Sequence, residues 1–120
     1  MEVRRPYERA GVRMVDKAVG GQDGGRALDG RAVLARRREI AWRTFEGEAI
    51  LVVTARDEIC HLNPVATFLW ESLDGRSSLV ELANKLCETF EVGREEALAD
   101  ALEFASDLLQ RGMVEVVEDA

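Results

Sequence analysis

The chain has 120 residues, which favours a single domain, and its hydrophobic content of 47% supplies a modest core. No apolar run reaches the roughly 18 residues that span a bilayer, and the N-terminus lacks the apolar region of a secretory signal, so we expect a cytoplasmic protein without membrane contact. Residues 1–38 contain ten Lys or Arg against five Asp or Glu, whereas residues 39–120 contain six against eighteen. This asymmetry predicts a flexible basic tail, residues 1–35, before a folded acidic domain, residues 36–120.

The tail contains Gly20-Gly21 and Gly24-Gly25 and shows no sustained hydrophobic period, so we expect disorder over Gly20–Gly30. The apolar residues before it suggest a short helix; they include Val12, Met14, Val15 and Val19. Two interpretations stay open: a solvated tail that is dispensable for folding, or a docking arm for an acidic partner or a nucleic acid.

Three strands are expected next, over Ile40–Phe45, Glu48–Thr54 and Glu58–Leu62. Side chains alternate along a strand, so Cys60 and Leu62 share one face and Ile59 and His61 the other. The Cys60 and Leu62 face should contact the helices, because Leu62 leads directly into the first of them.

Three helices follow the strands. Asn63 is a favourable N-cap before Pro64, and Asp74-Gly75 is expected to end that helix. Ser78 begins the second helix with an S-x-x-E capping box.

The third helix is expected over Arg94–Arg111, with Gly112 as its stop and a short strand within Met113–Val117. Together these elements predict an α+β fold that is winged helix-turn-helix-like, with a three-stranded antiparallel sheet followed by three helices.

Catalytic machinery is not evident. Cys60 and His61 are adjacent in a strand and point to opposite faces, which argues against a nucleophile–base pair. With Cys87 they make too small a ligand set for a structural zinc, and both cysteines are expected as reduced thiols in the core. We therefore expect a protein that is not an enzyme and that has no cofactor and no metal.

A winged-helix DNA-binding regulator is the alternative. Its recognition helix would be the third helix, whose charged residues are Glu95, Glu96, Asp100, Glu103 and Asp107 against Arg94 and Arg111. DNA binding requires cations that neutralise phosphates, so this composition argues against a nucleic-acid partner.

The chain from about Arg36 to Val117 resembles the PqqD-like family of peptide chaperones, which are recognition elements for ribosomally made, post-translationally modified peptides. The matching pieces, in order, are Trp42, AILVV at Ala49–Val53, ICHLNP at Ile59–Pro64, FLW at Phe68–Trp70, Asp74-Gly75, SLVEL at Ser78–Leu82 and LQRGMV at Leu109–Val114. The first thirty or so residues lie outside the resemblance, and many family members start close to the first strand.

The resemblance implies a non-catalytic module that binds the leader of a precursor peptide and presents it to a modifying enzyme, often a radical S-adenosylmethionine enzyme. It also implies that the leader adds as a strand to the third sheet strand, beside the third helix. Phe104 is then either an apolar anchor for the leader or a completing residue of the core. The residues expected to bind the peptide are Glu58, Ile59, Cys60, His61, Leu62, Ala97, Asp100, Ala101, Phe104, Asp107 and Leu108.

Overall fold

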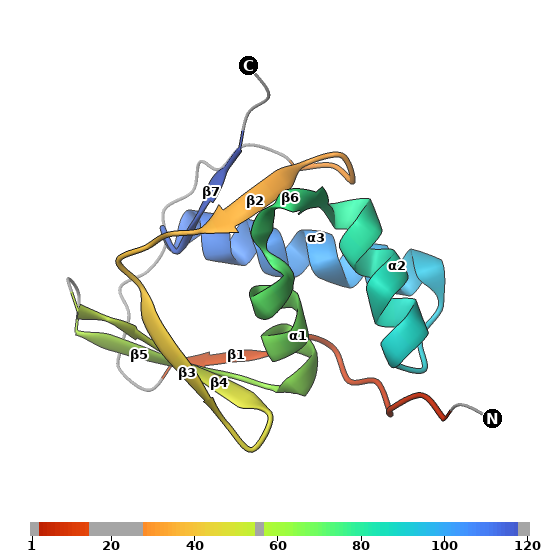
Figure 1. The fold of residues 1–120 in the computed structure, drawn as a ribbon, viewed down its shortest axis with the longest axis horizontal. Helices are drawn as coiled ribbons and strands as arrows, with labels where there is room; N and C mark the ends of the chain where they lie inside the picture. The colour runs from red at the N-terminus through yellow and green to blue at the C-terminus, as the bar shows by residue number, and fades with distance from the viewer. Residues whose placement is uncertain (1–2, 15–27, 55–56, 118–120) are drawn as a thin grey trace.

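The computed structural model describes residues 3–14, 28–54 and 57–117 (Figure 1). Within these residues seven strands and three helices follow one another along the chain. In order they are β1 (Val12–Met14), β2 (Val33–Arg36), β3 (Ala41–Phe45), β4 (Glu48–Val53), β5 (Glu58–Leu62), α1 (Pro64–Ser72), β6 (Asp74–Ser78), α2 (Leu79–Thr89), α3 (Arg94–Gln110) and β7 (Val114–Val116).

The larger sheet has the strand order β1-β5-β4-β3, and all its neighbours are antiparallel. Three of its strands, β3-β4-β5, form the three-stranded antiparallel sheet expected from the sequence, and that prediction is confirmed together with the α+β class. Glu46 and Gly47 form the first turn with φ angles of 53° and 81°. Such left-handed angles suit a tight hairpin connection.

The two faces of this sheet differ in burial. Leu51, Cys60 and Leu62 are fully buried, whereas Ile59 is 41% exposed. The expectation that Cys60 and Leu62 face the core is therefore confirmed. His61 lies on the outer face with its Nε2 3.0 Å from Oε1 of Glu48.

Capping residues begin the first two helices as the sequence indicates. Asn63 Oδ1 accepts a hydrogen bond from Ala66 N at 2.9 Å. Ser78 and Glu81 form the complete capping box of α2. Gly112 follows α3 with φ of 75°, which is the left-handed conformation that ends helices.

The end of α1 differs from the prediction. The helix ends at Ser72 rather than at Asp74-Gly75, and Asp74–Ser78 forms strand β6. Asp74 Oδ1 accepts hydrogen bonds from the backbone N–H groups of Arg76 and Ser77 at 2.8 and 3.1 Å. These two bonds lower the pKa of the Asp74 carboxyl and bend the chain from the helix into the strand.

A second sheet has the order β6-β2-β7, with β2 in the centre. Leu34 of β2 is fully buried, and Ala32 O and Gly30 O accept hydrogen bonds from Leu79 N and Val80 N at 3.0 and 2.9 Å. Residues 28–35 thus pack within the domain, although the sequence assigns them to the tail. The sequence gives no sign of this packing, because Leu34 is the one fully buried residue of the segment and the exposed Arg31 and Arg38 lie on either side of it.

The N-terminal residues also differ from expectation. Val12–Met14 forms strand β1 rather than part of a short helix, because an edge of β5 is available and β-branched valine suits a strand. Val15, Val19 and most of Gly20–Gly30 lie outside the described residues.

The position of Leu34 leads to a prediction about stability. Leu34→Ala should lower the free energy of unfolding by about 2–5 kcal/mol, because it leaves a cavity at a fully buried site. Chemical denaturation measures the loss. Val80→Ala is a suitable control, since that side chain is 40% exposed. Equal stability of both variants would show that β2 does not belong to the core.

Candidate functional site

The candidate site is the edge of β5 that faces away from β4, together with the neighbouring surface of α3. In this structure β1 lies along that edge, with Val12 opposite Leu62, Arg13 opposite His61 and Met14 opposite Cys60. Asn63 N donates to Gly11 O at 3.1 Å, one position before Val12. Antiparallel pairs alternate between hydrogen-bonded and non-hydrogen-bonded, so Arg13 and His61 form the next bonded pair. The His61 N–H and C=O therefore point toward β1.

Asn63 joins the strand edge to the start of α1. Its Oδ1 caps the helix, while its Nδ2 donates to Arg9 O at 2.7 Å. Gly11 packs so closely that a Cβ atom there would come within 3.1 Å of Nδ2. One side chain thus serves two segments that are far apart in the sequence.

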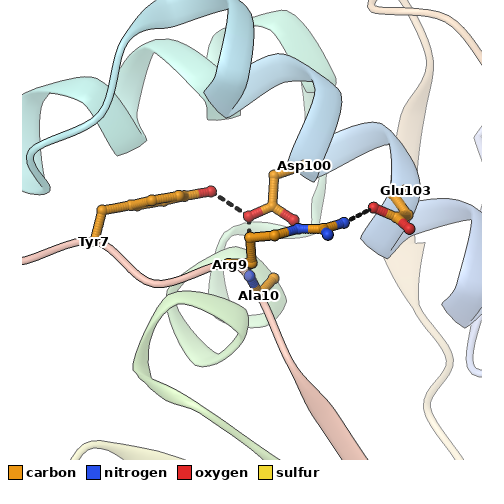
Figure 2. Close-up of polar contacts among 5 residues, drawn as sticks. All are labelled: Tyr7, Arg9, Ala10, Asp100 and Glu103. Atoms are coloured by element: carbon orange, nitrogen blue, oxygen red, sulfur yellow. Dashed lines mark hydrogen bonds and ion pairs between the residues drawn. The ribbon is translucent and has the colours of Figure 1, made fainter.

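The α3 side of the site is polar and acidic (Figure 2). Asp100 is 5% exposed, and its Oδ2 accepts hydrogen bonds from the Tyr7 hydroxyl and, at 2.9 Å, from Ala10 N. One turn later, Glu103 forms an ion pair with Arg9. Buried carboxylates are costly unless hydrogen-bonded, so the two donors to Asp100 stabilise its buried position.

Tyr7 is the titratable group most affected by this arrangement. Burial raises the pKa of its hydroxyl above the usual range, and the hydrogen bond to Asp100 adds to the shift. The negative charges of Asp100 and Glu96 act in the same direction, and Arg9 opposes them. The neutral, donating phenol is thus the form that this site favours.

A third contact lies at the connection between α2 and α3. Arg5 N donates to Thr89 O at 2.9 Å, and Glu91 N donates to Arg5 O at 2.8 Å. The Arg5 guanidinium lies 4.7 Å from the centre of the Phe90 ring, and the Tyr7 ring meets that ring edge-on. Residues 3–14 therefore follow one path from Phe90, along α3, to β5.

An open hollow of about 380 Å³ lies between this path and α3. Its lining residues are Arg9, Ala10, Val12, Asp100, Glu103, Phe104, Ser106, Asp107 and Gln110. Phe104 is 5% exposed and packs with the core, so it belongs to both the core and the wall of the hollow. The hollow is thus apolar at one wall and acidic at its rim.

The structure brings together part of the predicted binding set. Asp100, Phe104 and Asp107 line the hollow, while Cys60, His61 and Leu62 lie opposite β1. The side chains of Cys60 and Leu62 point into the core, so only their backbone belongs to the edge.

The remaining predicted residues lie elsewhere. Ala97, Ala101 and Leu108 are at most 1% exposed and pack in the core. Glu58 is buried at the far end of β5, and Ile59 lies on the outer face.

Sequence reasoning did not assign Asn63, Glu103, Tyr7 or Arg9 to the site. Asn63 was interpreted only as a helix cap, and Glu103 only as one acidic residue of α3. The Tyr7 and Arg9 pair lies in a stretch without hydrophobic period. The detectable signal was charge: a basic N-terminal stretch and an acidic helix in one chain.

Within the described ranges, no group of three or more His, Cys, Asp or Glu residues is arranged to hold a metal ion. In the same part of the chain, no helix is long and apolar enough to cross a membrane.

The chain is a small α+β protein in which an edge strand of the larger sheet pairs with an extended segment. Sequence comparison identifies the family to which it belongs. Residues 48–114, more than half of the chain, match the family model described as "Coenzyme PQQ synthesis protein D (PqqD)". The chain therefore belongs to the PqqD family. Comparison with curated proteins gave no match.

A solved structure has the same fold. The structure described as "TbiB1 in Complex with the TbiA(beta) Leader Peptide" aligns with a TM-score of 0.62 at 17% identity. The alignment covers 71% of this chain and 99% of that chain. At this identity the similarity establishes the shared fold, and the bound leader peptide is a property of TbiB1.

Proposed function

We propose that this protein binds the leader of a ribosomally made precursor peptide by strand addition at β5. The observation that carries the proposal is the pairing of β1, because there the Cys60–Leu62 edge accepts an extended antiparallel segment. Backbone groups of an edge strand pair with a peptide independently of its side chains. Family membership and the leader complex of the structural relative support the same mode.

Specificity would come from the groups beside the edge. Asp100 and Glu103 favour hydrogen-bond donors and cations, whereas Phe104 offers an apolar wall. A leader with basic residues near an extended apolar stretch fits this combination. The acidic surface of α3 disfavours DNA, so the winged-helix shape gives no support to a regulator of transcription.

The module acts without catalysis of its own in this proposal. It presents the bound leader to a separate peptide-modifying enzyme, such as a radical S-adenosylmethionine enzyme, and needs no cofactor. Fold alone does not define chemistry, so this part rests on the family and on the character of the site.

Titration with the leader of the cognate precursor peptide tests the proposal. Calorimetry should detect binding, and backbone chemical shifts should change most at Cys60–Asn63 and along the Asp100–Asp107 side of α3. Absence of binding, or changes confined to β3 and β7, would reject the site. Turnover of the precursor by the purified protein alone would reject the non-catalytic role.

Phe104 provides the sharpest test of the hollow. Phe104→Ala should weaken leader binding by about 1–3 kcal/mol, as expected for an apolar anchor at the centre of an interface. Because the side chain is 5% exposed, thermal unfolding must be measured in parallel. Phe104→Leu keeps most of the apolar volume and should retain both stability and affinity. Unchanged affinity in a folded Phe104→Ala protein would exclude this residue from the site.

A further inference from the structure

The strand edge and the two carboxylates that the proposed function offers to a leader are already in use within the chain. The β5 edge pairs with β1, Asp100 accepts from Tyr7 and Ala10, and Glu103 pairs with Arg9. These contacts come from a single stretch, residues 3–14, which is separated in sequence from all of its partners.

We propose that residues 3–14 are an internal ligand of the leader site, which an incoming leader of matching chemistry must displace. The inference rests on the proposed function for the identity of the competitor. It rests on the structure for the occupied state.

The segment is held at three places, which argues for a specific fit. Its start forms two backbone hydrogen bonds around Phe90 through Arg5, its middle meets Asp100, and its end pairs with β5. The Asn63 side chain also donates to its backbone at Arg9 O. Backbone contacts at both ends fix the register, while Tyr7 and Arg9 supply the side-chain contacts between them.

The contacts of residues 3–14 also predict the features that a competing leader needs. A competing leader would place an extended stretch against Cys60–Leu62, and a hydrogen-bond donor at the position of Tyr7. A cation at the position of Arg9 would replace the ion pair with Glu103. A leader that lacks these donors would leave the buried Asp100 without its present partners and would compete poorly.

Covalent attachment gives the segment an advantage over free peptide. A tethered ligand acts at an effective concentration of order mM for short flexible linkers. The leader competes with that concentration, so the parent protein should bind a leader more weakly than a protein whose segment is released. A segment that is docked for at least about nine-tenths of the time would weaken leader binding at least about tenfold.

A backbone substitution in the full chain releases the segment. Arg13→Pro removes the N–H that faces His61, whereas Arg13→Ala removes the same side chain and charge but keeps the N–H. The probe is a synthetic peptide with the sequence of residues 3–14, followed by the leader. Arg13→Pro should bind both at least about tenfold more tightly than Arg13→Ala or the parent, and amide exchange at His61 should accelerate.

A reversible cross-link should hold residues 3–14 on the β5 edge, which is the opposite of release. Met14 stands opposite Cys60 in a non-hydrogen-bonded pair, whose Cα separation in antiparallel sheets suits a disulfide. Oxidised Met14→Cys protein should lose binding of the probe and the leader, and reduction of the same sample should restore it.

The outcomes separate the two proposals. If Arg13→Pro binds the residue 3–14 peptide but no leader, the internal ligand stands and the leader function is rejected. If all variants and the oxidised cross-link bind the leader with equal affinity, the leader function stands and the internal ligand is rejected. Failure of Arg13→Pro to bind the residue 3–14 peptide, with unchanged exchange at His61, also rejects the internal ligand.

Discussion

Trp70→Ala should lower the free energy of unfolding by about 3–5 kcal/mol, the range for removing a large aromatic side chain from a core. Trp70 is completely buried in α1, and Trp42 meets it edge-on with ring centres 6.0 Å apart. Small domains are stable by only about 5–15 kcal/mol, so this loss should be a large fraction of the total stability of the protein. Circular dichroism during urea denaturation measures the effect.

The matched variant is Trp70→Phe. Trp70 Nε1 is buried and has no hydrogen-bond partner among the described residues, so removing it eliminates an unpaired polar group. That gain offsets part of the lost volume, and Trp70→Phe should cost clearly less than Trp70→Ala. A Trp70→Ala protein that unfolds at the same urea concentration as the parent would contradict the burial of this residue.

Asp100→Asn should lower the pKa of the Tyr7 hydroxyl toward its ordinary value of about 10. The substitution removes a negative charge that faces the phenol, and two of the causes that raise the Tyr7 pKa come from Asp100. Tyr7 is the only tyrosine of the chain, so the absorbance of tyrosinate during a pH titration reports this group alone. Glu96→Gln removes a charge without a hydrogen bond and should shift the pKa less.

The direction of the pH effect on docking follows from the same shift. Docked Tyr7 holds its proton more tightly than released Tyr7, because its pKa is raised in the docked state. The stabilisation is therefore complete below about pH 10 and is lost as the pH rises above that value. Docking of residues 3–14 in the parent protein should therefore weaken in alkaline solution, which NMR signals of a selectively labelled Tyr7 ring would follow. Ordinary titration of Tyr7 in the parent would contradict the buried contact.

Much of the domain was predictable because local signals agree with the final packing. Asn63-Pro64, the Ser78 capping box and Gly112 each mark a helix boundary through backbone chemistry that depends on few distant groups. Alternation in Glu58–Leu62 identified the buried face of β5 for the same reason.

The second sheet, β6-β2-β7, was harder to predict from the sequence. β2 has four residues and β7 three, and each is ordered by partners far away in the chain. Leu34 looks like an isolated apolar residue in a basic stretch until β6 and β7 are placed on either side.

Only part of the candidate site could be predicted from the sequence. The sequence indicated the edge strand and the acidic helix, because both lie within regular elements. It missed Tyr7 and Arg9, whose positions depend on Asp100 and Glu103 more than ninety residues later. Residues that act through one long-range contact carry no periodic signal, so only their complementary charge was visible.

The placement of β7 has a practical consequence for how this domain can be tethered. Val117 N donates to Val33 O at 2.8 Å, so the chain enters β2 and leaves β7 at neighbouring points. These strands lie at the end of the molecule remote from β1 and β5 (Figure 1). A protein or solid support attached after Val117 would therefore begin away from the β5 edge. Immobilisation through this end should leave the β5 edge open to peptides, which makes it the suitable orientation for surface-based binding measurements.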